Sequence, residues 1–181
     1  MNKDSIKTEK KLNSPGSIEG RISGLSELLG VQGRIAGIDF GDVRTGVALC
    51  EASRVLATGV AVISPGGLYK TAAAAAEMLK ELGASAAVVG LPVNMDGSEG
   101  PRADRCRRFA EVLNAMSGLP VAMCDERLST AAAARYLNET DTRGKERKRV
   151  IDALSAELIL QSALDRLKIE IERERQNGAE E

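Results

Sequence analysis

Short apolar runs alternate with longer amphipathic segments between residues 34 and 167. Three runs rich in β-branched residues, each either apolar or alternating in polarity, predict strands at residues 34–39, 45–51 and 55–63. Their short connections favour an antiparallel meander. The next segment is rich in alanine, has a helical period and ends at Gly83, so it predicts a helix over residues 68–82.

The remaining segments predict two more strands and three more helices. Continuous apolar runs at residues 86–91 and 121–124 are typical of strands that are covered on both faces. Amphipathic segments predict helices at residues 100–117, 131–137 and 150–167. A hairpin unit followed by strand–helix–strand crossovers indicates an α/β fold with a mixed five-stranded sheet and helices on both faces, which is the ribonuclease H-like arrangement.

The two ends of the chain differ from this central part. Residues 1–33 are rich in Lys, Ser, Glu and Gly and have little apolar surface to offset the entropy cost of ordering, so we expect a flexible N-terminal extension. Residues 168–181 are charged and predict a tail that continues the last helix. The expected organisation is one ribonuclease H-like domain over residues 34–167, with an extension at each end.

Composition excludes several classes of function. The chain has no His, which excludes Ser-His-Asp and Cys-His catalysis and zinc bound by His. Aromatic residues make up 2%, too few for base-by-base stacking on single-stranded nucleic acid. The three cysteines form no CxxC pair, which indicates a reducing compartment, and no apolar run predicts a signal peptide or a membrane span. We therefore expect a cytoplasmic protein.

The net charge of −1 conceals two basic clusters. Four Arg residues occur between positions 102 and 108, and Lys and Arg alternate through residues 143–149. Each cluster taken alone is explained equally well as a solvated surface or as a contact for nucleic acid. Their interpretation depends on the residues beside them.

Three acids lie at the ends of apolar segments. Asp39 ends the first strand, Glu126 follows the last one, and Asp152 is expected in the first turn of the final helix. Separately, they are also explained as a turn residue, a partner of Arg127 or Arg44, and an acid that favours the helix dipole. Together, buried acids require a shared counter-charge, and carboxylates favour hard ions such as Mg²⁺ or Mn²⁺.

Small side chains accompany Asp152 on its predicted helix. Ser155 and Ala156 follow three and four positions later, so they lie on the same helical face. A face of small residues lets the helix approach the sheet closely and bring a short Asp side chain to the strand ends. Ordinary close packing of an alanine-rich helix explains the same residues.

Four segments resemble, in order, the signature blocks of one known family. They read GIDFGDVRTGVA, VVGLPVNMDGSEGPRADRCRRFAEVL, CDERLSTAAAARYL and KRVIDALSAELILQ. These blocks are similar to those of the YqgF family, also called RuvX, and the resemblance covers residues 34–167. Members of that family resemble Holliday-junction resolvases and are assigned to nucleolytic processing of precursor 16S ribosomal RNA. Ser155 stands where the family often has Ala.

The resemblance implies a nuclease with a ribonuclease H-like fold that hydrolyses phosphodiester bonds with Mg²⁺ or Mn²⁺. The family's first-strand acid corresponds to Asp39, the Glu of its DER motif to Glu126, and its last-helix acid to Asp152. These three residues are the expected catalytic metal ligands. The implied substrate is structured precursor ribosomal RNA, processed at the 5′ end of 16S rRNA, or alternatively branched DNA.

Arg44 is a candidate for holding the substrate beside Asp39. It projects from a loop with glycines that are expected to let phosphate approach the backbone, namely Gly37, Gly41 and Gly46. A contact with phosphate and an ion pair with Asp42 or Glu126 explain Arg44 equally well.

Two further segments are expected to contact nucleic acid. Asn94 lies in a long polar loop after a buried strand, where it could orient a phosphate or a metal-bound water, or form an Asx turn with Asp96. Lys145 and Arg147 belong to the basic run immediately before Asp152, where they could hold the nucleic-acid backbone beside the scissile bond.

Two rival classes fit part of the sequence. The segment DFGDVRTG also resembles the first phosphate loop of actin-like ATPases and sugar kinases, but those proteins need two such lobes, and this chain has length for one. A non-catalytic domain that binds nucleic acid would keep the same fold, although three intact acids argue against that class.

Overall fold

The computed structural model describes residues 20–126 and 144–177 of the 181-residue chain. The elements are, in order, η1 (Leu25–Gly30), β1 (Arg34–Asp39), β2 (Thr45–Cys50), β3 (Ala57–Ile63), α2 (Leu68–Glu81), β4 (Ala84–Leu91), α3 (Pro101–Ser117), β5 (Val121–Asp125) and α5 (Gly144–Asn177). The five predicted strands and three of the predicted helices are confirmed. The helix predicted at residues 131–137 lies outside the described residues.

The strands form one mixed sheet in the order β3-β2-β1-β4-β5. The pairs β1–β2 and β2–β3 are antiparallel, as expected for a meander, whereas β4 and β5 add in parallel to the other edge of β1. Because β1, β4 and β5 run in the same direction, their carboxyl ends meet at one edge of the sheet. Asp39 and Asp125, which end β1 and β5, therefore lie at this edge.

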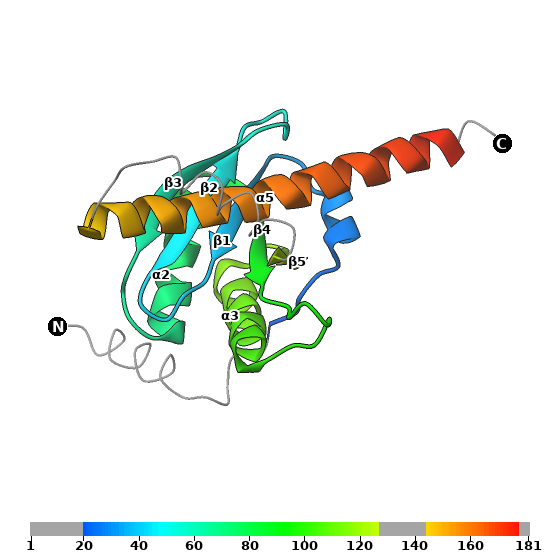
Figure 1. The fold of residues 1–181 in the computed structure, drawn as a ribbon. Helices are drawn as coiled ribbons and strands as arrows, with labels where there is room; N and C mark the ends of the chain where they lie inside the picture. The colour runs from blue at the N-terminus through cyan, green and yellow to red at the C-terminus, as the bar shows by residue number, and fades with distance from the viewer. Residues whose placement is uncertain (1–19, 127–143, 178–181) are drawn as a thin grey trace.

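Helices cover both faces of the sheet, as predicted (Figure 1). One hydrophobic core lies between the sheet and α5 and includes Ile35, Val88 and Leu160. The other core lies beneath α2 and α3 and includes Ile38, Val89 and Phe109. Successive residues of β1 and β4 thus alternate between the two cores, which explains why the central positions of these strands are apolar.

Glycines on the sheet let α5 approach the strands closely. A Cβ atom at Gly46 of β2 would lie 1.9 Å from the carbonyl oxygen of Asp152, and one at Gly37 of β1 would lie 2.7 Å from that of Ala156. The expectation that these two glycines admit phosphate is therefore wrong, because the backbone of α5 occupies that space. As expected, the small face of α5 at Ala156 lets this helix approach the sheet closely.

Helix α5 begins earlier than the sequence indicated, and it continues past residue 167 as expected of the charged tail. It begins at Gly144 rather than near residue 150, so Asp152 lies more than two turns inside the helix and not in its first turn. It also continues to Asn177, and its exposed C-terminal part extends beyond the sheet (Figure 1). None of the helices in the described ranges is both long enough and apolar enough to cross a membrane.

Part of the predicted N-terminal extension packs against the domain. Leu28 of η1 is fully buried in the core beneath α5. Arg54, in the turn between β2 and β3, donates hydrogen bonds to the carbonyl oxygens of Gly33 (2.7 Å) and Val31, which fixes the end of this segment. The described residues before β1 thus contribute apolar surface to the fold.

Candidate active site

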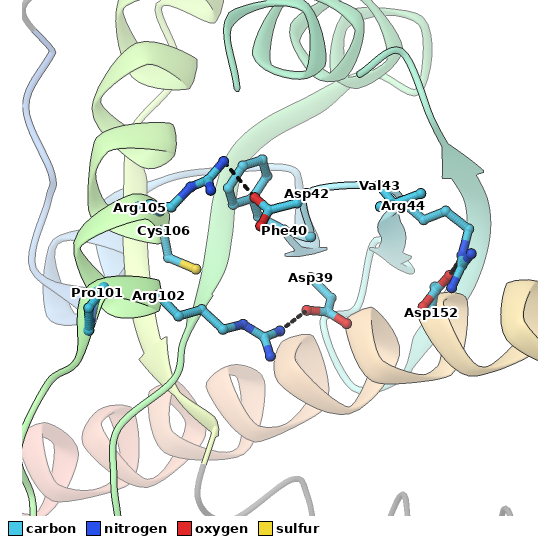
Figure 2. A pocket seen from close by; sticks show the side chains of 11 residues that line it. Asp39, Phe40, Asp42, Val43, Arg44, Pro101, Arg102, Arg105, Cys106 and Asp152 are labelled. Carbon is cyan, nitrogen blue, oxygen red and sulfur yellow. Dashed lines mark hydrogen bonds and ion pairs between the residues drawn. The ribbon is translucent and has the colours of Figure 1, made fainter. Parts of the chain in front are cut away.

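A cleft of about 490 Å³ opens at the carboxyl end of β1. Its walls are the loop after β1, the first turns of α3 and one turn of α5 (Figure 2). The charged side chains that line it are Asp39, Asp42, Arg44, Arg102, Arg105 and Asp152. Two of the three predicted catalytic acids therefore share one cleft, although they are 113 positions apart in the sequence.

Asp39 lies between the walls of this cleft, and its side chain is only 18% exposed. Burial raises the pKa of its carboxyl, the positive charge of Arg102 lowers it, and the negative charge of Asp152 raises it again. A hydrogen bond from Ser155 of α5 also stabilises the charged form. The local sequence marks Ser155 only as a small residue, because its contact with Asp39 depends on how α5 crosses the sheet.

Glu126 follows β5, and its carboxylate extends over β4. A Cβ atom at Gly90 of β4 would lie 2.1 Å from Glu126 Oε1, so only Gly leaves room for this side chain. Burial, and after it the nearby negative charge of Asp39, raise the pKa of Glu126 to about 7. Because β4 lies between β5 and β1, this position brings Glu126 toward Asp39, as the sequence predicted.

Asp152 forms an ion pair with Arg44, in which Nε of Arg44 donates to Oδ2 of Asp152. Neither of the partners proposed for Arg44 from the sequence, Asp42 or Glu126, is the one found. Asp42 instead pairs with Arg105 of α3, with 2.6 Å between Oδ1 and Nη2. Arginines thus face the acids from both sides, with Arg44 and Arg102 on opposite sides of Asp39 (Figure 2).

Comparison with known proteins identifies the family. The family model for RuvX, described as Holliday junction resolvase, matches residues 33–166. The chain belongs to the RuvX family. A relative from Rhodopseudomonas palustris strain TIE-1 is 46% identical over 137 residues, which cover 76% of this chain and 86% of the relative. A relative from Moorella thermoacetica is 46% identical over 134 residues, or 74% of this chain and 96% of the relative. Both carry the name "Putative pre-16S rRNA nuclease".

Solved structures support the same fold. The chain resembles the RuvC of T. thermophilus in complex with Holliday junction substrate, with a TM-score of 0.50 and 16% identity. The match covers 76% of this chain and 97% of that protein. The resemblance confirms the ribonuclease H-like arrangement that the order of elements predicted.

The acids of this RuvX family member have the donor chemistry of a site for a hard divalent cation. Asp39 interacts electrostatically with both Asp152 and Glu126, and the resulting repulsion between like charges would be relieved by a shared cation. Within residues 20–126 and 144–177, however, no three acidic or Cys side chains are close enough to form a ready-made metal-binding group. The ion pair of Asp152 with Arg44 and the approach of Arg102 to Asp39 provide positive charge in place of a cation.

The other predicted substrate contacts have different environments. Asn94 donates a hydrogen bond to Ser98 Oγ (2.9 Å) within its own loop, and Asp96 accepts one from the Ser98 amide (2.9 Å). The Asx-type turn in this loop is thus made by Asp96, and Asn94 contacts the same turn through Ser98. Lys145 and Arg147 lie in the first turns of α5, and their side chains are outside the described part of the structure.

Three buried residues in or beside the cleft are unsuited to base stacking or nucleophilic attack. Phe40 and Phe109, the two Phe residues of the chain, stack on each other with 4.2 Å between ring centroids, and they hold the loop after β1 against α3. Neither ring is therefore available to a nucleic-acid base. Burial raises the pKa of Cys106 to about 12, so this thiol remains protonated and is a poor nucleophile.

Proposed function

We propose that this protein is a metal-dependent nuclease that hydrolyses phosphodiester bonds during maturation of the 5′ end of 16S ribosomal RNA. The observation that carries the proposal is the position of Asp39 at the cleft, in electrostatic contact with both Glu126 and Asp152. The names of its relatives in the RuvX family support ribosomal RNA as the substrate.

Asp39, Glu126 and Asp152 would hold one or two Mg²⁺ or Mn²⁺ ions through carboxylate oxygens. A bound ion of this kind lowers the pKa of an attacking water and stabilises negative charge on the leaving oxygen. The absence of His from the chain is compatible with this chemistry, because carboxylates provide all the ligands. Ser155 positions Asp39 by donating a hydrogen bond to it.

The substrate backbone would lie across the cleft. Arg44, which pairs with Asp152, would contact phosphate if a cation held by that acid weakened the ion pair. Lys145 and Arg147 precede Asp152 on α5 and would contact the backbone further along the strand, with Asn94 at the opposite loop.

A cytoplasmic location fits the proposed function and the cysteines of the chain. Thiols stay reduced in that compartment. Cys50, Cys106 and Cys124 are all free and buried, which suits that compartment.

A cleavage assay with the Asp39→Asn variant tests the proposed site. The wild-type protein should cut a precursor 16S rRNA fragment in Mg²⁺ or Mn²⁺ and lose this activity in EDTA. Asp39→Asn should abolish cleavage while its circular dichroism and thermal unfolding remain those of a folded protein. Asp104→Asn, which changes an exposed acid on α3, is the matched control and should cut normally. Full cleavage by Asp39→Asn would exclude the proposed site.

A second candidate substrate is branched DNA, which the description of the family model favours. The two substrates can be separated by offering the RNA fragment and a four-way DNA junction to the same preparation. Selective cleavage of the RNA supports the proposal, and selective cleavage of the junction supports the resolvase alternative. Binding without cleavage of either substrate would indicate a non-catalytic domain.

A further inference from the structure

The four arginines of α3 divide into two pairs with different surroundings. Arg107 forms two hydrogen bonds with the carboxylate of Glu99, at 2.8 and 2.5 Å. Arg108 donates to Glu111 Oε2 at 2.9 Å. Both guanidinium groups therefore have acidic partners away from the cleft, and neither residue lines it.

Arg102 and Arg105 lie on the cleft wall instead (Figure 2). The guanidinium of Arg102 extends toward Asp39, with 4.0 Å between Nη2 and Oδ1, which is longer than a hydrogen bond. The Arg102 side chain is 67% exposed, so its donors are accessible from the solvent side of the cleft. Arg105 is held by Asp42 in an exposed ion pair of the kind that contributes little stability.

The charge of the cleft lining is balanced in the structure as it stands. Three Asp and three Arg side chains line it, with Arg102 on one side of Asp39 and Arg44 on the other. With a divalent cation held by the acids, the lining becomes net positive. Phosphate groups are the ligands that such a lining favours, and a planar guanidinium can bind two phosphate oxygens at once.

We propose that Arg102 is a substrate-binding residue that contacts a backbone phosphate of the nucleic acid beside Asp39, opposite Arg44. In this arrangement Arg102 supplies the α3 side of a phosphate site, and Arg105, linked to Asp42, positions the loop after β1 against that helix. This inference rests on the proposed nuclease function and assigns to α3 a contact that Arg44 alone cannot supply.

Equilibrium binding tests this assignment separately from cleavage. A Glu126→Gln background is used to prevent cutting, and binding of a fluorescein-labelled precursor 16S rRNA fragment and of a labelled four-way DNA junction is measured by anisotropy in Mg²⁺ over a range of salt. Arg102→Gln is compared with Arg107→Gln, which removes the same charge from the same helix outside the cleft. Arg102→Lys keeps the positive charge but loses the planar guanidinium group, which can bind two phosphate oxygens at once.

Arg102→Gln should weaken binding about tenfold, the loss expected for one exposed charge-assisted hydrogen bond. The slope of log affinity against log salt should fall by about 0.7 to 0.9, the value for one phosphate contact. Arg107→Gln should bind within about twofold of the background protein. Arg102→Lys should restore the salt slope and recover part of the affinity, because the charge remains.

The outcomes separate this inference from the proposed function. Equal affinity and equal salt slope for Arg102→Gln and Arg107→Gln would overturn the role of Arg102, even if the wild-type protein cuts RNA. A wild-type protein that binds but never cuts would contradict the nuclease proposal and leave the comparison of the two Arg variants decisive for the phosphate site. Absence of binding to both nucleic acids would overturn both.

Discussion

The charged side chains around the cleft act mainly on the ionisation of Asp39. Its carboxyl lies between the guanidinium of Arg102 and the carboxylate of Asp152, and it accepts a hydrogen bond from Ser155. Burial, the largest effect, raises its pKa, and so does Asp152, whereas Arg102 and Ser155 lower it. Keeping these buried carboxylates charged is therefore unfavourable for the folded protein. A bound cation would offset much of that unfavourable free energy.

The raised pKa of Glu126 makes the stability of the folded protein depend on pH. Its pKa in the folded protein is about 7, above the ordinary value of 4.5, so the folded state binds more protons than the unfolded state between these pH values. Without metal, the free energy of unfolding should therefore fall as pH rises from about 5 to 7, by up to about 2 kcal/mol for this group. Urea unfolding in EDTA at several pH values measures the slope.

The matched variant is Glu126→Gln, which removes the titrating group and keeps the shape of the side chain. Its unfolding free energy should vary less between pH 5 and 7 than that of the wild-type protein. The remaining slope has the same sign, because the pKa of Asp39 is also raised. An identical slope in the two proteins would show that Glu126 titrates normally.

At the scale of elements, contact between α5 and the sheet fixes where Asp152 lies. The carbonyl oxygen of Asp152 lies over Gly46, and that of Ala153 lies 2.9 Å from where a Cβ of Gly59 would be. Two glycines on neighbouring strands therefore support the same turn of α5, the turn that carries an acid of the site. This turn of α5 therefore both packs on the sheet and carries an acid of the cleft.

Gly46→Ala should consequently destabilise the fold and disturb the cleft together. The added methyl group would meet backbone atoms of α5, which cannot move aside as a flexible side chain could. We expect a loss of about 1–3 kcal/mol or more in unfolding free energy, measured by urea denaturation, together with reduced cleavage. Gly30→Ala is the control, since nothing lies within 4 Å of its added methyl, and it should change stability by less than about 0.5 kcal/mol. Equal stability of the two variants would contradict this packing.

At the scale of the whole molecule, the folded unit includes residues before β1. Leu28 has 0% exposure, and Leu25 and Val31 pack beside it against the core under α5. Short segments without many apolar residues resemble flexible termini in sequence, and the burial of one Leu by a distant helix leaves no local pattern. The core beneath α5 therefore includes a residue that precedes the predicted domain start at residue 34.

Leu28→Ala measures how much this segment contributes. Truncation of a fully buried Leu should lower the unfolding free energy by about 2–5 kcal/mol, as judged from urea denaturation. Ser26→Ala, at an exposed position of η1, should have almost no effect. A small effect of both variants would mean that η1 detaches from the domain at little cost.

Sequence patterns were sufficient for the five strands, for the mixed sheet and for the expectation that Asp39 and Glu126 lie at the same end of it. Apolar runs at β1, β4 and β5 identify parallel buried strands, so the meeting of Asp39 and Glu126 at one edge follows from topology. The partner of Arg44, the contact of Ser155 and the division of the α3 arginines required the crossing geometry of α5 and α3. Those contacts join segments that are distant in sequence. Because each of these side chains has several possible partners, a local pattern does not identify the partner that it contacts.

The ion pair between Arg44 and Asp152 joins positions 108 residues apart, and this separation bears on when the protein becomes active. During synthesis, β1 and the loop after it leave the ribosome long before Asp152 is made. The cleft cannot be completed until α5 has been translated and has closed that long loop. An unfinished chain therefore carries Arg44 without its partner on α5, and the proposed nuclease activity is delayed until α5 has been made and has packed on the sheet.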